Sequence, residues 1–252
     1  MRMRLMKFRL KAFGLHLLAS AGVLTLILGA LYLGWYHWPG WYLANASQVV
    51  LVLVCVDVVV GPLLTFVIAN PSKPRRELAR DIGIIAAVQV CALLYGSVSL
   101  WNGRPLYYAF SEDALSVVQA YDINDHEAEL ARKQNGEFAP HWYSLPRWVW
   151  APRPQEPKER EEIKSTGDDV ISMPRYFKSW EQGLPSLRDQ LKKADEWRYF
   201  TPGEKKRLKL RLQAAGLPPD QPNAIPITGR ARPVLAVLDP VSLKITTMLR
   251  PN

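Results

Sequence analysis

The sequence predicts a bundle of three transmembrane helices, followed by an extracytoplasmic α+β domain with an antiparallel sheet. Three apolar segments of roughly 20 residues or more lie in the first hundred positions, and each is long enough to cross a hydrocarbon core of ~30 Å. After Trp101 the pattern changes to short alternating segments and proline-rich connections, which is typical of a folded domain outside the bilayer. We therefore divide the chain into a basic tail (1–13), a membrane domain (14–101) and a C-terminal domain (102–252).

The predicted spans cover residues 14–38, 47–69 and 82–101. The first and third contain no Asp, Glu, Lys or Arg, and the second contains only Asp57. A cleaved signal peptide is the alternative for the first span, because Ala44-Asn45-Ala46 imitates a cleavage site. The apolar segment is longer than the core of a typical signal peptide and two more spans follow, which favours a retained helix.

Basic residues gather on one predicted side of the membrane. Five of the first eleven residues are Lys or Arg, and the segment Asn70–Asp81 adds four more against two acids. By the positive-inside rule, the N-terminus and this segment are cytoplasmic, so the C-terminal domain lies outside the inner membrane, in the periplasm of a Gram-negative bacterium. Amphipathic rings gather at the predicted outer boundary, as such rings prefer: Trp35, Tyr36, Trp38, Trp41, Tyr42 and Trp101.

Several function classes are disfavoured by composition and motifs. The net charge of +9 comes mostly from the two cytoplasmic segments, and the C-terminal domain is nearly balanced, so we expect no nucleic-acid binding. Both cysteines, Cys55 and Cys91, fall inside predicted spans, which argues against a disulfide. The chain has no P-loop, GxGxxG or GxSxG motif, and the acidic cluster Asp122–Glu129 matches no metal-binding spacing. We expect no enzyme activity, no cofactor and no metal.

The C-terminal domain contains two predicted β-hairpins and three predicted helices. The first hairpin joins Arg104–Phe110 to Ala114–Tyr121, and the second joins Pro233–Asp239 to Ser242–Arg250. We expect the two hairpins to complete one antiparallel sheet. A helix capped by Asn124 runs to about Gln134, and two further helices are expected at Pro185–Trp197 and Thr201–Gly216.

Asp57 is the strongest candidate for a functional residue, because a carboxylate inside a membrane span is costly and normally faces a protein interior. Gly61 and Thr65 follow it at helical spacing, and Gln89 of the third span lies within about two turns of the same depth. Two interpretations remain open: Asp57 forms a hydrogen bond that holds the bundle together, or it docks a foreign transmembrane helix. An ion path is less well supported, since it would need a chain of such groups.

A second candidate site is the aromatic segment HWYSLPRWVW, from His141 to Trp150. Its tryptophans, Trp142, Trp148 and Trp150, have three open roles: they fill the domain core, rest on the outer leaflet or contact a partner protein.

Several blocks resemble the TfpX/TfpZ family of type IV pilin accessory proteins, in order along essentially the whole chain. They are KFRLKAFGLHLLAS (Lys7–Ser20), VDVVVGPLLTFVIANPSKPRRELARD (Val56–Asp81), GRPLYYAF (Gly103–Phe110), PITGRARPVLAVLD (Pro226–Asp239) and the terminal LRPN. The resemblance implies a bacterial inner-membrane protein that acts on the major type IV pilin, affecting its stability, assembly or retraction, without catalytic residues.

On this basis we expect Asp57, Gly61, Thr65 and Gln89 to contact the pilin helix. We expect the loops around His141–Trp150 and Pro174–Trp180 to contact its globular head. The basic segment Asn70–Asp81 is a candidate contact for membrane lipids or for other inner-membrane components of the pilus. Two alternatives stay open: a membrane-embedded enzyme that uses Asp57 as an acid or base, and a receptor-like or immunity-like protein that binds another periplasmic partner.

Overall fold

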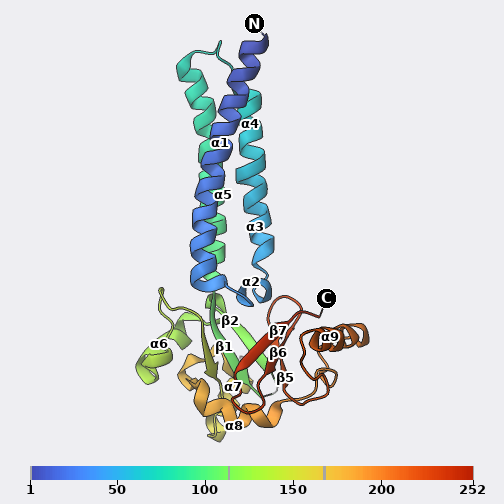
Figure 1. The fold of residues 1–252 in the computed structure, drawn as a ribbon. Helices are drawn as coiled ribbons and strands as arrows, with labels where there is room; N and C mark the ends of the chain where they lie inside the picture. Colours follow the sequence, from blue (N-terminus) through green and yellow to red (C-terminus); the bar gives the residue numbers. More distant parts are fainter. Residues whose placement is uncertain (1, 113, 167–168, 252) are drawn as a thin grey trace. The chain divides into compact units, whose positions relative to one another are not determined.

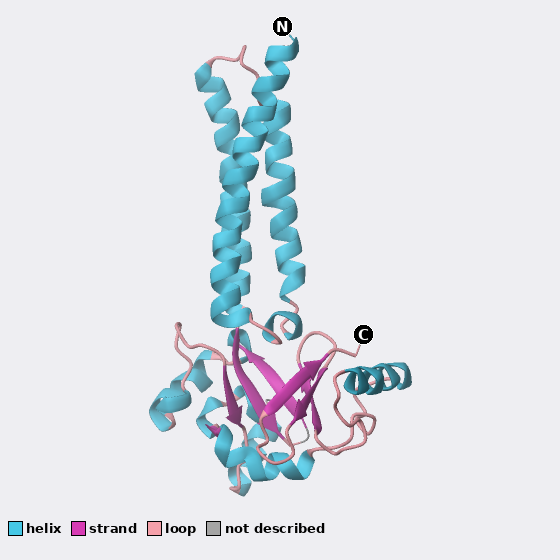
Figure 2. Cartoon of the chain, viewed as in Figure 1, coloured by secondary structure: helices cyan, strands magenta, loops and turns pink. Residues whose placement is uncertain are grey.

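The computed structural model describes residues 2–112, 114–166 and 169–251, so Met1 and Asn252, the ends of the predicted tail and C-terminal domain, lie outside the described part (Figures 1 and 2). The chain forms two compact units. The helical unit comprises the residues up to Gly34 together with Ala46–Asn102, and the globular unit comprises Trp35–Asn45 together with Gly103–Asn252. The globular unit is therefore built from two separate stretches of chain.

The helical unit contains three helices that are long and apolar enough to cross a membrane, which confirms the predicted membrane helical region (Figure 1). The first is α1 (Arg2–Leu31), continued by the π-helical turn η1 (Tyr32–Tyr36). The second consists of α3 (Ala46–Val54), the π-helical segment η2 (Cys55–Val60) and α4 (Gly61–Ile68), and the third is α5 (Arg75–Asn102). α1 packs mainly against α4, while α5 packs against α3 and α4.

Two helices extend beyond the predicted spans on the basic side. α1 begins at Arg2 and not near residue 14, because neither proline nor glycine precedes Gly14 and the Arg, Lys, Leu and Met residues there favour helix. α5 begins at Arg75, directly after Pro74. The charged segments are thus helical continuations of the apolar ones.

The π-helical segment η2 interrupts the second span at Asp57. Pro62 has no N–H group, so the α-helical bond to the carbonyl of Val58 cannot form. One residue earlier, the Gly61 N–H group reaches the carbonyl of Val56, five residues back. This wider turn is the local distortion that π-helical segments introduce into α-helices, and it is frequent at functional sites.

The globular unit contains a seven-stranded sheet with the order β4-β3-β1-β2-β5-β6-β7 (Figure 2). The strands are β1 (Pro105–Ser111), β2 (Ala114–Gln119), β3 (Arg147–Trp150), β4 (Lys178–Ser179), β5 (Ala224–Thr228), β6 (Val234–Leu238) and β7 (Ile245–Leu249). Both predicted hairpins, β1–β2 and β6–β7, are present and antiparallel, and the α+β class is confirmed. The sheet as a whole is mixed, because β3 pairs parallel to β1 and β5 parallel to β2 after long connections.

Three helices of the globular unit, α6 (Asp125–Gln134), α8 (Trp180–Gln190) and α9 (Pro202–Ala214), begin at capping side chains. The unit also contains α2 (Gly40–Leu43) and α7 (Pro157–Thr166), with 3-10 turns η3 (Ala120–Asp122), η4 (Gly136–Phe138), η5 (Val170–Ser172) and η6 (Pro174–Tyr176). The predicted caps Asn124 and Thr201 are confirmed. α8 begins and ends earlier than the predicted helix Pro185–Trp197, because Ser179 and Gln182 form a capping box at Trp180.

Strand β1, which lies between β3 and β2, is buried on both faces of the sheet. Tyr108 and Phe110 face one hydrophobic cluster together with residues of β5, β6, α8 and α9. Tyr107 and Ala109 face a second cluster with residues of α6 and β3. This alternation follows from the two-residue period of a strand, and it gives the unit two apolar layers with the sheet between them.

The segment Trp35–Asn45, which joins the first two spans, is an integral part of the globular unit. Leu43 is fully buried in the first hydrophobic cluster. Its carbonyl oxygen accepts hydrogen bonds from the main-chain N–H groups of Arg230, at 2.7 Å, and Ala231, at 3.2 Å. The sequence predicts only that the rings of this segment lie at the outer boundary of the membrane, and the structure shows that the segment packs into the core of the globular unit.

A charged contact at the start of α9 predicts acid sensitivity of the globular unit. Glu204 caps the helix by accepting the Thr201 N–H group at 2.8 Å, and the Arg232 guanidinium donates to Glu204 Oε1 at 2.7 Å. These donors lower the pKa of Glu204 from 4.5 to about 2. A lowered folded-state pKa stabilises the fold above the unfolded value, so this contribution is lost as the pH falls from about 4.5 toward 2.

We therefore expect the Glu204→Gln variant to be less stable than the parent protein at pH 6 and to unfold at a lower temperature. The loss in free energy of unfolding should be on the order of 1–2 kcal/mol, because Arg232 is half-exposed and solvent weakens its interaction with Glu204. The deficit should shrink as the pH is lowered toward 3. Thermal unfolding of the solubilised protein at a series of pH values measures both. A deficit that is constant with pH would show that the carboxylate charge contributes nothing.

Candidate partner-binding site

The structure brings the four predicted intramembrane residues together inside the helical unit. Asp57, Gly61 and Thr65 come from the second span, and Gln89 comes from the third. All four are buried, and Asp57 is only 4% exposed. They lie between helices of this chain, so they form a polar cluster inside the bundle and not a stripe on the outer face of one helix.

The π-helical turn explains how Gln89 joins this cluster. In a regular helix the Gly61 N–H group would bond to the carbonyl of Asp57, but here it bonds to Val56. The Asp57 carbonyl is thereby released, and Gln89 Nε2 donates to it at 3.1 Å. A side chain of the third span thus satisfies a main-chain acceptor of the second.

Gly61 allows this contact because it has no side chain. A Cβ atom at Gly61 would lie 2.0 Å from Gln89 Nε2, closer than atoms can approach. The sequence predicts that Gly61 lets another helix approach closely, and in the structure the helix that approaches is the chain's own third span.

His16, which its place in the sequence puts near the inner surface of the membrane, is a further member of the cluster. Its Nδ1 atom lies 2.6 Å from Thr65 Oγ1, so α1 is bonded to α4 within the bundle. The signal that could have identified it is helical spacing, since His16, Ser20 and Val23 share one face of α1.

A cavity of ≈ 200 Å³ lies beside the cluster, between α1 and α5. Its walls are mainly small or apolar, and Ala19 and Val23 on one side and Ala86 and Val90 on the other are exposed. Asp57 and Gln89 are its buried polar residues. The lining residues are His16, Ala19, Ser20, Val23, Asp57, Ala86, Gln89, Val90 and Leu93, and we call this feature the α1–α5 groove.

The α1–α5 groove contains hydrogen-bond acceptors that lack donors. Among the described residues, neither Asp57 Oδ2 nor Gln89 Oε1 has a hydrogen-bond partner, and both atoms are buried. An unsatisfied polar group costs free energy in an apolar environment, and most in a membrane. Small rim residues let a second helix approach closely. The groove is therefore suited to a transmembrane helix that supplies a hydrogen-bond donor.

Comparison with known proteins places the chain among proteins of fimbrial assembly. No protein-family model and no solved structure matches it. Fimbrial assembly proteins of Dichelobacter nodosus do: the serogroup I protein is 27% identical over 245 residues, covering 95% of this chain and 94% of the relative, and the serogroup E1 protein is 26% identical over the same shares. The protein of serogroups C1 and C2 is 31% identical over 116 residues, which are 46% of this chain and 88% of the relative.

The chain belongs to the fimbrial assembly protein family. The relatives are named for assembly and not for a catalysed reaction. Their names agree with the predicted role in pilus assembly. Membership of the TfpX/TfpZ group stays a prediction.

In this fimbrial assembly family member, the three predicted tryptophans have different surroundings. Trp148 stacks on Tyr108, with 4.5 Å between ring centroids, and Trp150 packs against the backbone at Gly183. Both belong to the packing around the first hydrophobic cluster. Trp142 is 73% exposed and is the most exposed of the three, since Trp148 and Trp150 are half-buried.

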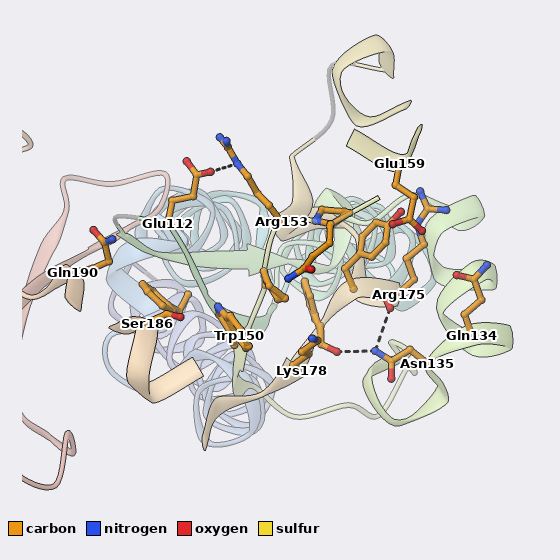
Figure 3. Close-up of a pocket in the computed structure, with 17 residues that line it drawn as sticks. Glu112, Gln134, Asn135, Trp150, Arg153, Glu159, Arg175, Lys178, Ser186 and Gln190 are labelled. Carbon is orange, nitrogen blue, oxygen red and sulfur yellow. Dashed lines mark hydrogen bonds and ion pairs between the residues drawn. The ribbon is translucent and has the colours of Figure 1, made fainter. Parts of the chain in front are cut away.

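A cleft of ≈ 790 Å³ in the globular unit is the second place where this family member could hold a ligand (Figure 3). Its charged residues are largely engaged within the chain. Arg153 pairs with Glu112, and the Lys178 ammonium lies 5.5 Å from the centre of the Trp150 ring. Arg175 lies 3.3 Å from the buried Glu127 carboxylate, which assigns a structural role to part of the predicted acidic cluster. We therefore regard the α1–α5 groove as the stronger site.

Proposed function

We propose that the chain is an inner-membrane accessory protein that binds the major type IV pilin and modulates its stability, assembly or retraction. The observation that carries this proposal is the α1–α5 groove, in a chain whose relatives are fimbrial assembly proteins. The resemblance to TfpX/TfpZ proteins names the partner. The charge distribution supports a cytoplasmic N-terminus and a periplasmic globular unit.

The proposed mechanism is binding without catalysis. Before assembly, a pilin resides in the inner membrane as one apolar helix with an outer globular head. Its helix would occupy the groove against Ala19 and Ala86, and a donor from that helix would satisfy Asp57 or Gln89. The acceptor atoms of Asp57 and Gln89 would lack hydrogen-bond donors in lipid but would have them in the complex. Forming these hydrogen bonds would therefore contribute to the free energy of binding. No cofactor or catalytic residue is required.

Photo-crosslinking in native membranes tests this function directly. A photoreactive amino acid is placed at Val90, on the groove rim, and in a matched variant at Leu51, which is 64% exposed on the second span outside the groove. We expect Val90 to capture the major pilin and Leu51 to capture it several-fold less. Capture of another protein from Val90, or equal capture from both positions, would overturn the proposal. The former result would favour a receptor-like or immunity-like role.

A further inference from the structure

We propose that the turn His141–Leu145 inserts its exposed rings into the lipid interface on the side of the bilayer where α1 ends and α5 ends. Three large apolar side chains in this turn are exposed: Trp142 at 73%, Tyr143 at 58% and Leu145 at 58%. Trp and Tyr favour the membrane–water interface, where the ring contacts hydrocarbon and the N–H or O–H group stays hydrated. This proposal does not depend on which protein occupies the α1–α5 groove.

Hydrogen bonds and ring contacts within the turn hold its rings in the exposed position. The Ser144 N–H group donates to the carbonyl of His141 at 3.1 Å, and Ser144 Oγ accepts the His141 N–H group at 2.9 Å. The His141 and Tyr143 rings stack at 5.2 Å, with Trp142 edge-on to Tyr143. A preorganised apolar projection of this kind loses little conformational entropy when it is buried.

The turn is bonded to residues that lie beside the membrane spans in the chain. Trp35 Nε1 donates to the Ser144 carbonyl at 2.6 Å, and Trp35 lies in the last turn of the first candidate span, Arg2–Tyr36. Arg104 donates to the Trp142 carbonyl at 3.4 Å and follows Asn102, the last residue of α5, by two positions. Since consecutive Cα atoms are about 3.8 Å apart, both anchors lie within about 8 Å of a span end.

Chemistry favours lipid over a protein partner for this surface. The segment Pro140–Pro146 contains no Lys, Arg, Asp or Glu, so it presents no charge pattern that a protein partner could complement. Elsewhere in the globular unit, the Arg250 guanidinium lies 5.3 Å from the Trp38 ring and 5.1 Å from the Tyr42 ring, and both rings belong to the aromatic group predicted at the outer boundary. Aromatic rings with a neighbouring cation match the boundary between acyl chains and phosphate groups.

The test uses the full chain in nanodiscs that contain only phospholipid. In a background in which Cys55 and Cys91 are replaced by alanine, single cysteines are introduced by Trp142→Cys, Leu145→Cys and, as the control, Val241→Cys, and each is labelled with an environment-sensitive fluorophore. Val241 is apolar and 82% exposed, and it lies in the β6–β7 turn. Lipids that carry a spin label near the headgroup then quench any probe that enters the interface.

We expect quenching at positions 142 and 145 to exceed quenching at position 241 several-fold, with a blue shift of emission. Equal quenching at all three positions would overturn the proposal. The proposal would also be overturned if probes at 142 and 145 are not quenched by lipid but are shielded from water when pilin is added. That result would assign the turn to a protein partner. Crosslinking of pilin from Val90 tests the α1–α5 groove in a separate experiment. Failure of the lipid proposal can therefore be distinguished from failure of the proposed pilin binding.

Discussion

An Ala86→Phe variant is expected to lose recovery of the pilin from native membranes by at least about tenfold, which corresponds to about 1.4 kcal/mol of binding free energy. Ala86 lies on the rim of the α1–α5 groove and is exposed, so a larger side chain is accommodated without disturbing the packed interior. The phenyl ring would fill the space in which we propose that the pilin helix binds. Co-purification of the pilin with the tagged full-length protein measures the effect.

The chain offers a matched control for this substitution in the adjacent residue. Ala87 is also an exposed alanine of α5, but it does not line the groove. Ala87→Phe adds the same ring to a different face of the same helix, about 100° away. We expect it to keep the parent level of pilin. Equal losses in the two variants, at unchanged thermal stability, would mean that the partner does not bind in the groove.

A Gly229→Val variant is expected to destabilise the globular unit by about 2–3 kcal/mol, because it overpacks a main-chain contact. A Cβ atom at Gly229 would lie 2.6 Å from the Leu43 carbonyl oxygen and 3.1 Å from its carbonyl carbon. Main-chain atoms cannot rotate away as a flexible side chain can. The clash would separate Leu43 from the N–H groups of Arg230 and Ala231 and leave that carbonyl without its donors.

Thermal unfolding of the solubilised protein checks the effect of Gly229→Val. Gly136→Val is the matched control, since a Cβ atom at Gly136 would have nothing within 4 Å. We expect a clear fall in melting temperature for the first variant and a small change for the second. A melting temperature of Gly229→Val close to that of the parent would show that the Leu43 contact contributes little to the stability of the fold.

Local patterns predict much of this fold because their determinants are local. The alternation in β1–β2 and β6–β7, and the caps at Asn124 and Thr201, depend on neighbours a few residues away. β5 is not predicted because Pro226 interrupts its apolar segment. Pro226 is tolerated there since β2 pairs with β5 only from Ile227 onward.

The sequence predicts most of the residues that form the candidate site, but not how they contact one another. An aspartate in an apolar span identifies Asp57, and helical spacing adds Gly61 and Thr65. The contact of Gln89 with a main-chain carbonyl depends on the π-helical turn, and the groove depends on how α1 and α5 diverge, so neither follows from periodicity. The tryptophans of one aromatic segment also differ for a reason that the segment itself does not show. Trp142 is exposed, whereas the parallel pairing of β3 with β1 places Trp148 against Tyr108 and leaves it half-buried.

The placement of Trp35–Asn45 within the globular unit has a consequence for biogenesis. This segment leaves the ribosome before the second and third spans, whereas its partners at Arg230 and Ala231 are made near the end of synthesis. The first hydrophobic cluster cannot close around Leu43 until both stretches have reached the same side of the bilayer. A chain with a misinserted span keeps that core open and exposes apolar surface to proteolysis. The fold thereby makes maturation of the globular unit conditional on correct topology.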